Sequence, residues 1–257
     1  MNSFGKCALL IAHPGHEIRV HGWLEKTKPV VYVLTDGSGR SAPSRLASTT
    51  RILIRAGARP GDIYGRLPDR ALYDAVLRHD LRFFRQLAVE LADGIVRERF
   101  DFVLGDAAEG EILTHDLWRG VIDAALADAQ QRLNTPIASY QFRLEGPPNQ
   151  RTVPFMTQSM QLLLNDAELA RKIEAARSYP ELKAAVEEAL AAYGEDAFRM
   201  EYLEPANGQT TSRQQVIPRY EHHGESLVAT GIYSEAVRYA RHVAPILTEL
   251  SRSQGVS

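Results

Sequence analysis

Two histidines three residues apart, His13 and His16, are the side chains best suited to chemistry near the start of the chain. They follow the apolar run 6–12, which Pro14 and Gly15 interrupt. Neutral imidazole is a common zinc ligand, and a catalytic zinc usually has three protein ligands and one open position. Because an HxxH pair also arises by chance, a metal site here requires a third ligand from elsewhere in the chain.

The richest polar stretch of the sequence begins at Asp106, directly after the apolar run 101–105. If the runs 6–12 and 101–105 are parallel strands, their carboxyl ends open on one edge of the sheet, where ligands bind in open α/β folds. His115 lies in this stretch and is then the natural third ligand for Zn²⁺. The alternative is structural, because acidic residues there would also stabilise the amino terminus of the helix that follows.

The segment Ala12-His13-Pro14-Gly15-His16-Glu17 resembles the Ala-His-Pro-Asp-Asp-Glu signature of the PIG-L/LmbE-like zinc-dependent deacetylases, which remove acyl groups from amino sugars and related amides. In that family the His and the second Asp bind zinc, and the first Asp is the general base. By position, His13 matches the His and His16 replaces the Asp ligand. Gly15 falls where the base would be.

The resemblance extends over roughly residues 6 to 145 in the order of the elements. The end of the second strand, Thr35-Asp36-Gly37, is similar to the same point of the family. The family also takes its last zinc ligand, a histidine, from the start of a helix, and this is the place of His115. The resemblance therefore implies a zinc-dependent deacetylase with a partly altered site.

Cleavage of an amide needs a proton acceptor for the water and a proton donor for the departing amine. Because Gly15 supplies neither, a replacement carboxylate is required. We predict Asp106 or Glu109 as the catalytic base, since the loop after residue 105 carries both. Glu17, directly after His16, is a further candidate.

Residues near the two loops are candidates for binding the substrate. The turn Asp36 to Gly39 has two glycines that let the backbone approach a ligand, although such turns are common after strands. Arg40 is predicted to bind an anionic substrate group, as are Arg45 and Arg51, and Glu111 reaches out from the acidic loop.

A second polar cluster, Pro218 to Glu225, contains Tyr220, His222 and His223. Gly224 suggests a turn here. One interpretation is that a histidine of this cluster, His222 as acid or His223 as a substrate contact, folds back over the metal together with Tyr220. The other is that the cluster is an exposed loop with adjacent charges.

The elements that must position these residues alternate between strand and helix. Apolar runs predict strands over 6–12, 29–35, 62–64, 101–105 and 136–142, and amphipathic patterns predict helices over 44–56, 69–97 and 117–133, with a break at His79 and Asp80. Helices between strands are the crossovers that a parallel sheet requires. The predicted fold class is α/β, a Rossmann-like and mostly parallel sheet flanked by helices.

The composition changes after residue 145, and we predict two regions. Residues 1–145 form the Rossmann-like metal-binding hydrolase core. Residues 146–257 form a mainly helical extension packed on the core, with helices over 156–170, 178–193 and 234–250. Such an extension can contribute to the active site or to a contact in a homo-oligomer.

Composition limits the classes of partner. The 257 residues carry a net charge of −2 with scattered basic residues, which predicts no nucleic-acid partner. Cys7 is the only cysteine, so no internal disulfide can form. The sequence has neither a signal-peptide pattern nor an apolar stretch of ~18 to 20 residues, which predicts a cytoplasmic protein with no membrane contact.

Three functions are compatible with these observations. The first is a zinc-dependent hydrolase, an N-deacetylase acting on an amino sugar or a related acylated small molecule. The second is a catalytically silent sugar-binding protein on the same scaffold, which the missing base at Gly15 favours. The third is a nucleotide-sugar or cofactor-binding transferase that uses the turns at 36–39 and 106–110. Bound zinc favours the first two over the third.

Overall fold

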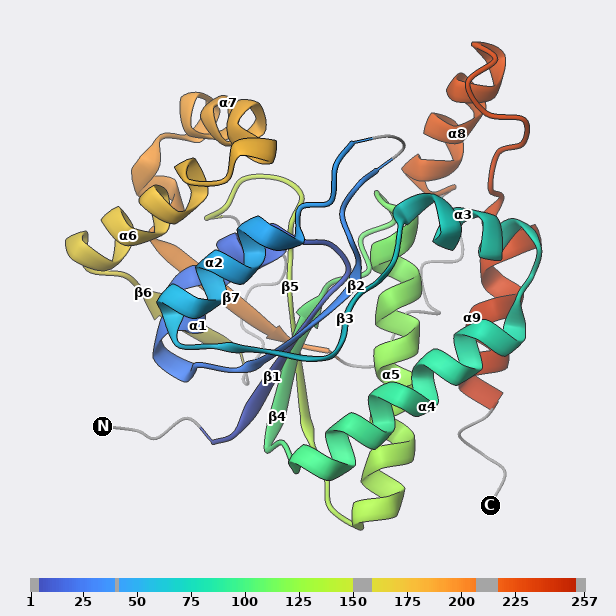
Figure 1. Ribbon diagram of the computed structural model, residues 1–257, viewed down its shortest axis with the longest axis horizontal. Helices are drawn as coiled ribbons and strands as arrows, with labels where there is room; N and C mark the ends of the chain where they lie inside the picture. The colour runs from blue at the N-terminus through green and yellow to red at the C-terminus, as the bar shows by residue number, and fades with distance from the viewer. Residues whose placement is uncertain (1–4, 40–41, 150–158, 207–216, 253–257) are drawn as a thin grey trace.

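The computed structural model describes residues 5–39, 42–149, 159–206 and 217–252, and within these ranges its centre is a seven-stranded sheet (Figure 1). The strands lie in the order β3-β2-β1-β4-β5-β7-β6. From β3 to β5 neighbouring strands are parallel, whereas β7 is antiparallel to both β5 and β6. The strands are β1 (Cys7–Ile11), β2 (Val30–Thr35), β3 (Arg59–Leu67), β4 (Phe102–Asp106), β5 (Ala138–Phe142), β6 (Met160–Leu163) and β7 (Met200–Pro205).

Helices cover both faces of the sheet (Figure 1). The α-helices in the described ranges are α1 (His21–Thr27), α2 (Leu46–Ala56), α3 (Asp69–Leu77), α4 (Leu81–Glu98), α5 (Leu113–Leu133), α6 (Asp166–Arg177), α7 (Lys183–Tyr193), α8 (Arg219–Ala229) and α9 (Ala244–Arg252). Single 3₁₀ turns are formed by His16–Val20, Pro180–Leu182 and Glu195–Phe198, and a π-helical turn, Tyr239–Val243, leads into α9. The predicted α/β class with a mostly parallel sheet is confirmed.

The central strand β1 is buried on both faces, as its uninterrupted apolar sequence predicts. Because successive side chains point to opposite faces, Ala8 and Leu10 join the core beneath α4, α5 and α9, whereas Leu9 and Ile11 join the core beneath α1, α2 and α6. Two apolar layers of this kind hold the carboxyl end of β1 rigidly at one edge of the sheet.

Most elements of the first 145 residues agree with the sequence prediction. The strands β1, β2, β4 and β5 lie within or next to the predicted runs, and β3 is longer than the three residues predicted. The long helical region is interrupted at His79, whose φ of 52° is left-handed. Asp80 then caps α4, because its side chain accepts a hydrogen bond from the Phe83 backbone amide at 3.0 Å.

Two predictions for the later residues were wrong. The helix predicted over 156–170 is in its described part a strand, β6, followed by α6, which Asn165 and Glu168 start with a capping box. The turn predicted at Gly224 is part of α8. Gly224 is buried there because α8 packs against the Ala236 segment, where an added Cβ would lie 3.2 Å from the Ala236 side chain.

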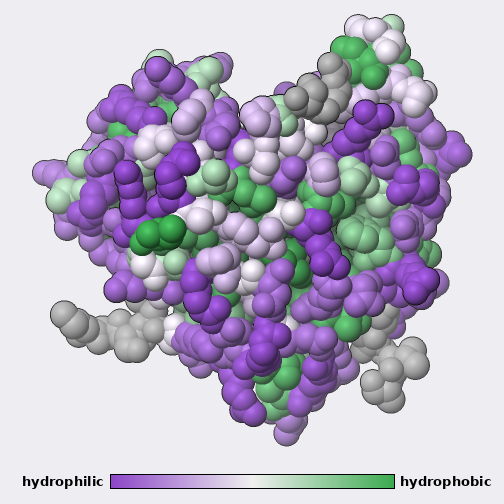
Figure 2. Space-filling view, in the orientation of Figure 1, coloured by the Kyte–Doolittle hydropathy of each residue, from purple (hydrophilic) through white to green (hydrophobic). Residues whose placement is uncertain are grey.

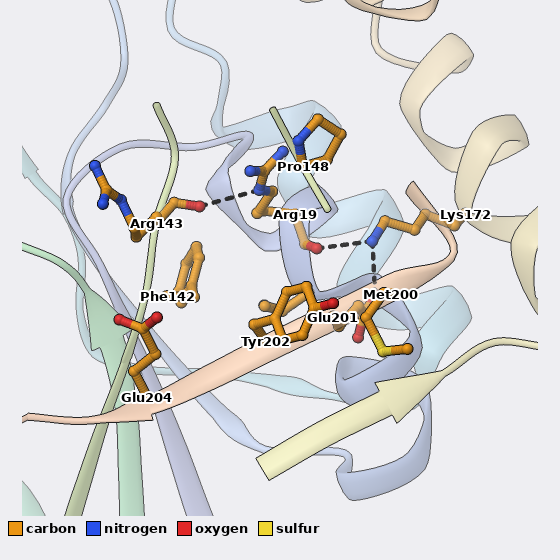
Figure 3. Close-up of a pocket in the computed structure, with 10 residues that line it drawn as sticks. Arg19, Phe142, Arg143, Pro148, Lys172, Met200, Glu201, Tyr202 and Glu204 are labelled. Carbon is orange, nitrogen blue, oxygen red and sulfur yellow. Dashed lines mark hydrogen bonds and ion pairs between the residues drawn. The ribbon is translucent and has the colours of Figure 1, made fainter. Parts of the chain in front are cut away.

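The chain after residue 145 shares the sheet with the first part, since β7 pairs with β5. Glu201 of β7 also fixes the start of α1, because its carboxylate accepts hydrogen bonds from the backbone amides of Gly22 and Trp23, both at 2.8 Å. Lys172 of α6 lies 2.8 Å from the same carboxylate, and both side chains are buried (Figure 3). Strand β7, α1 and α6 therefore meet at a buried ion pair.

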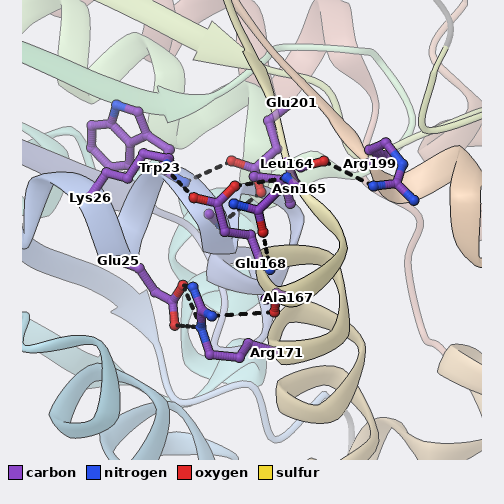
Figure 4. A network of polar contacts seen from close by, with 11 residues as sticks. Trp23, Glu25, Lys26, Leu164, Asn165, Ala167, Glu168, Arg171, Arg199 and Glu201 are labelled. Carbon is purple, nitrogen blue, oxygen red and sulfur yellow. Dashed lines mark hydrogen bonds and ion pairs between the residues drawn. The ribbon is translucent and has the colours of Figure 1, made fainter.

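Exposed pairs surround this buried one. Arg171 of α6 makes two hydrogen bonds of 2.9 Å to the carboxylate of Glu25 on α1, and Lys26 pairs with Glu168 (Figure 4). The Lys172 ammonium donates to the carbonyl oxygen of Arg19, in the wall of a cavity of about 20 Å³ (Figure 3). A cavity of this size holds about one water molecule, so it belongs to the packing and is too small for a substrate.

The surface is mostly hydrophilic on the face shown in Figure 2, with hydrophobic residues in small separate areas and at the outer end of α8. None of the described helices combines the length and apolarity that a membrane span requires.

Candidate metal centre

Three loops meet at one edge of the sheet because the strands before them are neighbours. Strand β1 lies between β2 and β4, and all three run in the same direction. Their carboxyl ends lead into residues 12–16, 36–39 and 107–112, respectively. This is the edge at which open α/β sheets bind ligands.

The three histidines of the predicted zinc site come together here. The ring centroids of His13 and His16 are 5.3 Å apart, those of His13 and His115 are 5.4 Å apart, and those of His16 and His115 are 4.8 Å apart. His115 reaches the cluster from the first turn of α5. Residues about 100 positions apart in the sequence thus form one imidazole cluster.

Gly15 lets the loop turn between its two histidines. Its φ of 107° is a conformation that other residues rarely adopt, and a Cβ there would lie 2.5 Å from a methyl carbon of Leu182. The peptide then enters a 3₁₀ turn that starts at His16. The residue that the sequence comparison placed at the position of the base therefore has a conformational reason to be glycine.

A buried carboxylate holds His16. The Oδ2 atom of Asp106, the last residue of β4, lies 2.8 Å from His16 Nδ1 and accepts a hydrogen bond of 2.7 Å from the Ala12 backbone amide. Burial raises the pKa of Asp106, but the nearby imidazoles and the hydrogen bonds lower it further, so that the net shift is downward. Asp106 is therefore a fully buried carboxylate, and a single one of its oxygens contacts both the Ala12 amide and His16.

A second carboxylate, on Asp69, lies beside His13. Asp69 Oδ1 lies 2.9 Å from His13 Nδ1, and Asp69 Oδ2 accepts a hydrogen bond from the Gly39 backbone amide at 2.6 Å. The Thr35 hydroxyl is 2.8 Å from the same His13 nitrogen. Burial raises the pKa of Asp69, but the contact with His13 and the other hydrogen bonds lower it to about 2.

Sequence reasoning did not assign a role to Asp69. An aspartate at the first position of a helix is favoured by the helix dipole alone, so its presence gave no functional signal. The available signal was its place after a strand of the same sheet, since β3 pairs with β2 and ends at this edge.

His115 differs from the other two histidines because neither ring nitrogen has a hydrogen-bond partner among the described residues, although its exposed fraction is only 1%. The Oδ1 atom of Asp106 is likewise buried and without such a partner in the described parts of the chain. Buried polar atoms are normally hydrogen-bonded, and those left over indicate a missing ion or water. The donor set, imidazoles and a carboxylate, suits zinc.

One ligand atom each from His16, Asp106 and His115 lies within 4.8 Å of the other two. His13 is outside this tight group, although its ring adjoins the rings of both other histidines. Two ligand sets are therefore compatible with the cluster: the three imidazoles, or His16 and His115 with Asp106.

Burial of His115 predicts a pH-dependent stability of the metal-free protein. Burial and the neighbouring His16 and His13 lower the pKa of His115 to about 3, whereas it is ~6.5 in an unfolded chain. Between these values only the unfolded chain binds the proton. The free energy of unfolding should therefore decrease as the pH falls from ~6.5 toward ~3, by up to about 1.4 kcal/mol per pH unit from this group.

Urea denaturation of chelator-treated protein at pH 7 and pH 5 measures this dependence. The variant His115→Gln has no titrating group at this position and serves as the control. Equal pH slopes for the wild type and the variant would contradict the prediction.

The other residues predicted for catalysis or substrate binding have partners outside the cluster. The carboxylate of Glu109 accepts hydrogen bonds from the Arg143 guanidinium at 2.9 Å and from the Leu144 backbone amide at 2.7 Å, so it ties two loops together. Glu111 lies 3.1 Å from Arg219. Asp36 accepts hydrogen bonds from the backbone amide and the hydroxyl of Ser38, within its own turn. Arg40 lies outside the described residues.

The predicted residues after 218 all lie on α8 but differ in their surroundings. Tyr220 packs against the core, and burial raises the pKa of its hydroxyl. His222 is exposed and lies 3.5 Å from Glu225. His223 lines a cleft of about 510 Å³.

This cleft lies between the β2–α2 loop and α8. Its lining residues are Gly37, Ser38, Gly39, Ala42, Pro43, Arg45, Glu181, His223, Leu227 and Tyr233. It adjoins the histidines through the Gly39 amide, which binds the same carboxylate as His13. Clefts of 300–1,000 Å³ are typical of small-molecule sites.

Comparisons with known proteins were made by sequence and by structure. No protein-family model matches the chain, and no curated protein matches its sequence significantly. A solved structure of the A40926 pseudoaglycone deacetylase Dbv21 is similar, with a TM-score of 0.52 and 16% identity over 79% of this chain and 97% of that one. So is a deacetylase–teicoplanin complex, with a TM-score of 0.50 and 14% identity over 78% and 98%. The chain therefore shares the fold of these two deacetylases.

Proposed function

We propose that the protein is a zinc-dependent hydrolase that removes an acyl group from the nitrogen of an amino sugar or a related small molecule. His13, His16 and His115 would hold the metal. The shared fold with deacetylases of 14–16% identity agrees with this proposal but does not carry it, because fold alone does not define function.

The observation that carries the proposal is the burial of His115 without hydrogen-bond partners for its ring nitrogens among the described residues. A buried imidazole with two unpartnered nitrogens among the described residues, next to two more imidazoles, is costly unless a ligand satisfies it. The nitrogens of His13 and His16 that face carboxylates are Nδ1 in both cases, which leaves both Nε2 atoms as the free ligand atoms.

When bound, zinc lowers the pKa of a coordinated water toward ~7 and polarises an amide carbonyl. The chain must orient the amide and supply a proton to the departing amine. The carboxylates that contact the cluster are already engaged: Asp69 with His13, and Asp106 with His16. His223 is the imidazole in the wall of the adjoining cleft, and we assign it the donation of the proton to the amine.

The lining of the cleft suits an amphipathic substrate. On one wall, Arg45 is held by a hydrogen bond of 2.6 Å from its Nε atom to the Gly37 carbonyl oxygen. On the other wall, Leu227 and Tyr233 present apolar surface. A polar sugar next to the loop and an apolar substituent next to α8 would fill such a cleft.

The proposal predicts that zinc-loaded protein releases primary amine from N-acetylated amino sugars, detected with an amine-reactive fluorophore. The variant His16→Ala should lose this activity, because it removes a metal ligand. His79→Asn is the matched control, since His79 is exposed and asparagine tolerates its left-handed backbone. Folded, zinc-loaded wild type without turnover of any N-acyl amino sugar tested would contradict a hydrolase.

A second candidate function is a zinc-containing sugar-binding protein without hydrolytic activity. Gly15 favours it, because no side chain at this position can accept a proton, and so do the carboxylates already engaged with His13 and His16. Binding of an N-acetylated sugar without release of amine, followed by calorimetry, would identify this function.

A further inference from the structure

We propose that Asp106 is a positioning residue for His16: it keeps the proton of this imidazole on Nδ1, so that Nε2 is the atom left for the metal. The proposal rests on the proposed zinc site and deepens it, because it assigns which nitrogen of His16 faces the metal. In this assignment the Oδ2 atom of Asp106 orients His16 and does not itself contact the metal.

The position of Asp106 follows from the sheet. Strands β1 and β4 pair in parallel with Leu10 opposite Gly105, so the next residues of both strands lie side by side at the carboxyl edge. Asp106 therefore reaches the backbone amide of Ala12, one residue before the metal loop begins. Gly105 leaves room for this approach, since a Cβ there would lie 3.1 Å from the Leu10 carbonyl oxygen.

Two groups converge on a single oxygen of Asp106. The Ala12 amide lies at 2.7 Å and His16 Nδ1 at 2.8 Å, and both contacts are to Oδ2. A backbone amide can only donate, and an ionised carboxylate can only accept. His16 Nδ1 must then be the donor, and a neutral imidazole that carries its proton on Nδ1 has its free electron pair on Nε2.

Both contacts occupy the acceptor positions of Oδ2, so this oxygen is not available to a metal, whereas Oδ1 is buried without a partner among the described residues. Metal-bound histidines commonly donate their other ring N–H to a carboxylate, which fixes the orientation of the ring and raises its basicity. The arrangement of His13 with Asp69 is similar, with Nδ1 on the carboxylate side. His13 Nδ1 also has the Thr35 hydroxyl at 2.8 Å, so in both imidazoles Nδ1 is the nitrogen that faces the supporting groups.

The variants Asp106→Asn and Asp106→Leu separate positioning from ligation. In the Asn variant the Ala12 backbone N–H needs an acceptor, so it should hold the side-chain oxygen of the new asparagine in place of Oδ2. This oxygen also faces His16, so the imidazole retains an acceptor. In the Leu variant the acceptor is lost, while the side chain keeps the same number of heavy atoms and the branch at Cγ. We therefore expect zinc affinity, measured by competition with a chromogenic chelator, to decrease by ~10–100-fold for Asp106→Leu and by clearly less for Asp106→Asn.

Nitrogen-15 NMR of metal-free wild type reads the proton directly and requires no variant of Asp106 to fold. We expect the His16 signals, identified by their absence in His16→Gln, to show a protonated Nδ1 and an unprotonated Nε2 at pH 7.5. A proton on Nε2 would overturn the proposal. Equal loss of zinc by folded Asn and Leu variants would also overturn it, because a ligand carboxylate would then be the better account.

Failure of the proposed function gives a different result. If the wild type binds no zinc, the metal site is refuted, whereas the protonation of His16 in the metal-free protein is still measured. If Nδ1 of His16 is protonated in the zinc-free protein, Asp106 still determines which ring nitrogen of His16 carries the proton.

Discussion

His115→Ala is expected to abolish stoichiometric zinc binding. The wild type should retain about one zinc per chain after dialysis, as a catalytic site does. The loss of a direct ligand should weaken zinc affinity by more than the ~10–100-fold that follows loss of an outer residue. Metal content by elemental analysis, together with amine release from N-acetyl amino sugars, measures both consequences.

The same substitution also removes the buried unpartnered imidazole, so the metal-free variant should remain folded. His79→Asn should retain the zinc of the wild type. A His115→Ala protein that holds one zinc per chain as tightly as the wild type would exclude His115 as a ligand, and with it the central observation behind the proposed function.

Lys172→Met is expected to decrease the free energy of unfolding by about 3–5 kcal/mol, the range for breaking a buried ion pair on one side. The substitution leaves the buried Glu201 carboxylate without its countercharge, although the amides of Gly22 and Trp23 still bind it. Burial lowers the pKa of Lys172 and its pairing with Glu201 raises it, with a net decrease. Urea denaturation monitored by circular dichroism measures the change.

Arg177→Met is the matched control, because Arg177 and Glu187 form an ion pair on the surface with side chains 47% and 49% exposed. Exposed pairs contribute about 0–1 kcal/mol. If Lys172→Met costs no more than this control, the junction of β7, α1 and α6 contributes little to stability.

The central strands and the histidine cluster could be predicted because their signals are local. Uninterrupted apolar runs marked β1, β2 and β4, and the topology of parallel strands then places the loops after them at one edge. His115 could be predicted as a neighbour of His13 and His16 from this argument, although 99 residues separate it from His16.

The outer part of the sheet could not be predicted in this way. Strand β6 is short and only half-buried, and its residues 160–163 favour a helix as readily as a strand. The signal that sequence reasoning missed was the capping box of Asn165 and Glu168, which places the start of α6 after this strand. The turn predicted at Gly224 was wrong for a different reason. This glycine lies inside α8, where close packing on Ala236 requires a small residue.

The proximity of the three histidines was predictable, but the groups that contact them were not. Asp106 was predicted as a base from its position after β4, whereas its two contacts on one oxygen depend on the distance between β1 and β4. Asp69 gave no signal beyond its place after β3, because its contact with His13 bridges 56 residues of sequence. Contacts of this kind depend on tertiary packing, which no local pattern encodes.

The capping of α1 by Glu201 has a consequence for the order in which the chain becomes ordered during synthesis. Domains form from the amino terminus while the ribosome is still extending the chain. The backbone amides of Gly22 and Trp23 donate hydrogen bonds to Glu201, which lies 179 and 178 residues further along the chain. The loop of His13 and His16 lies directly before α1, so it is synthesised long before the residue that caps this helix. The start of α1 can therefore have its complete set of hydrogen bonds only after translation has passed β7.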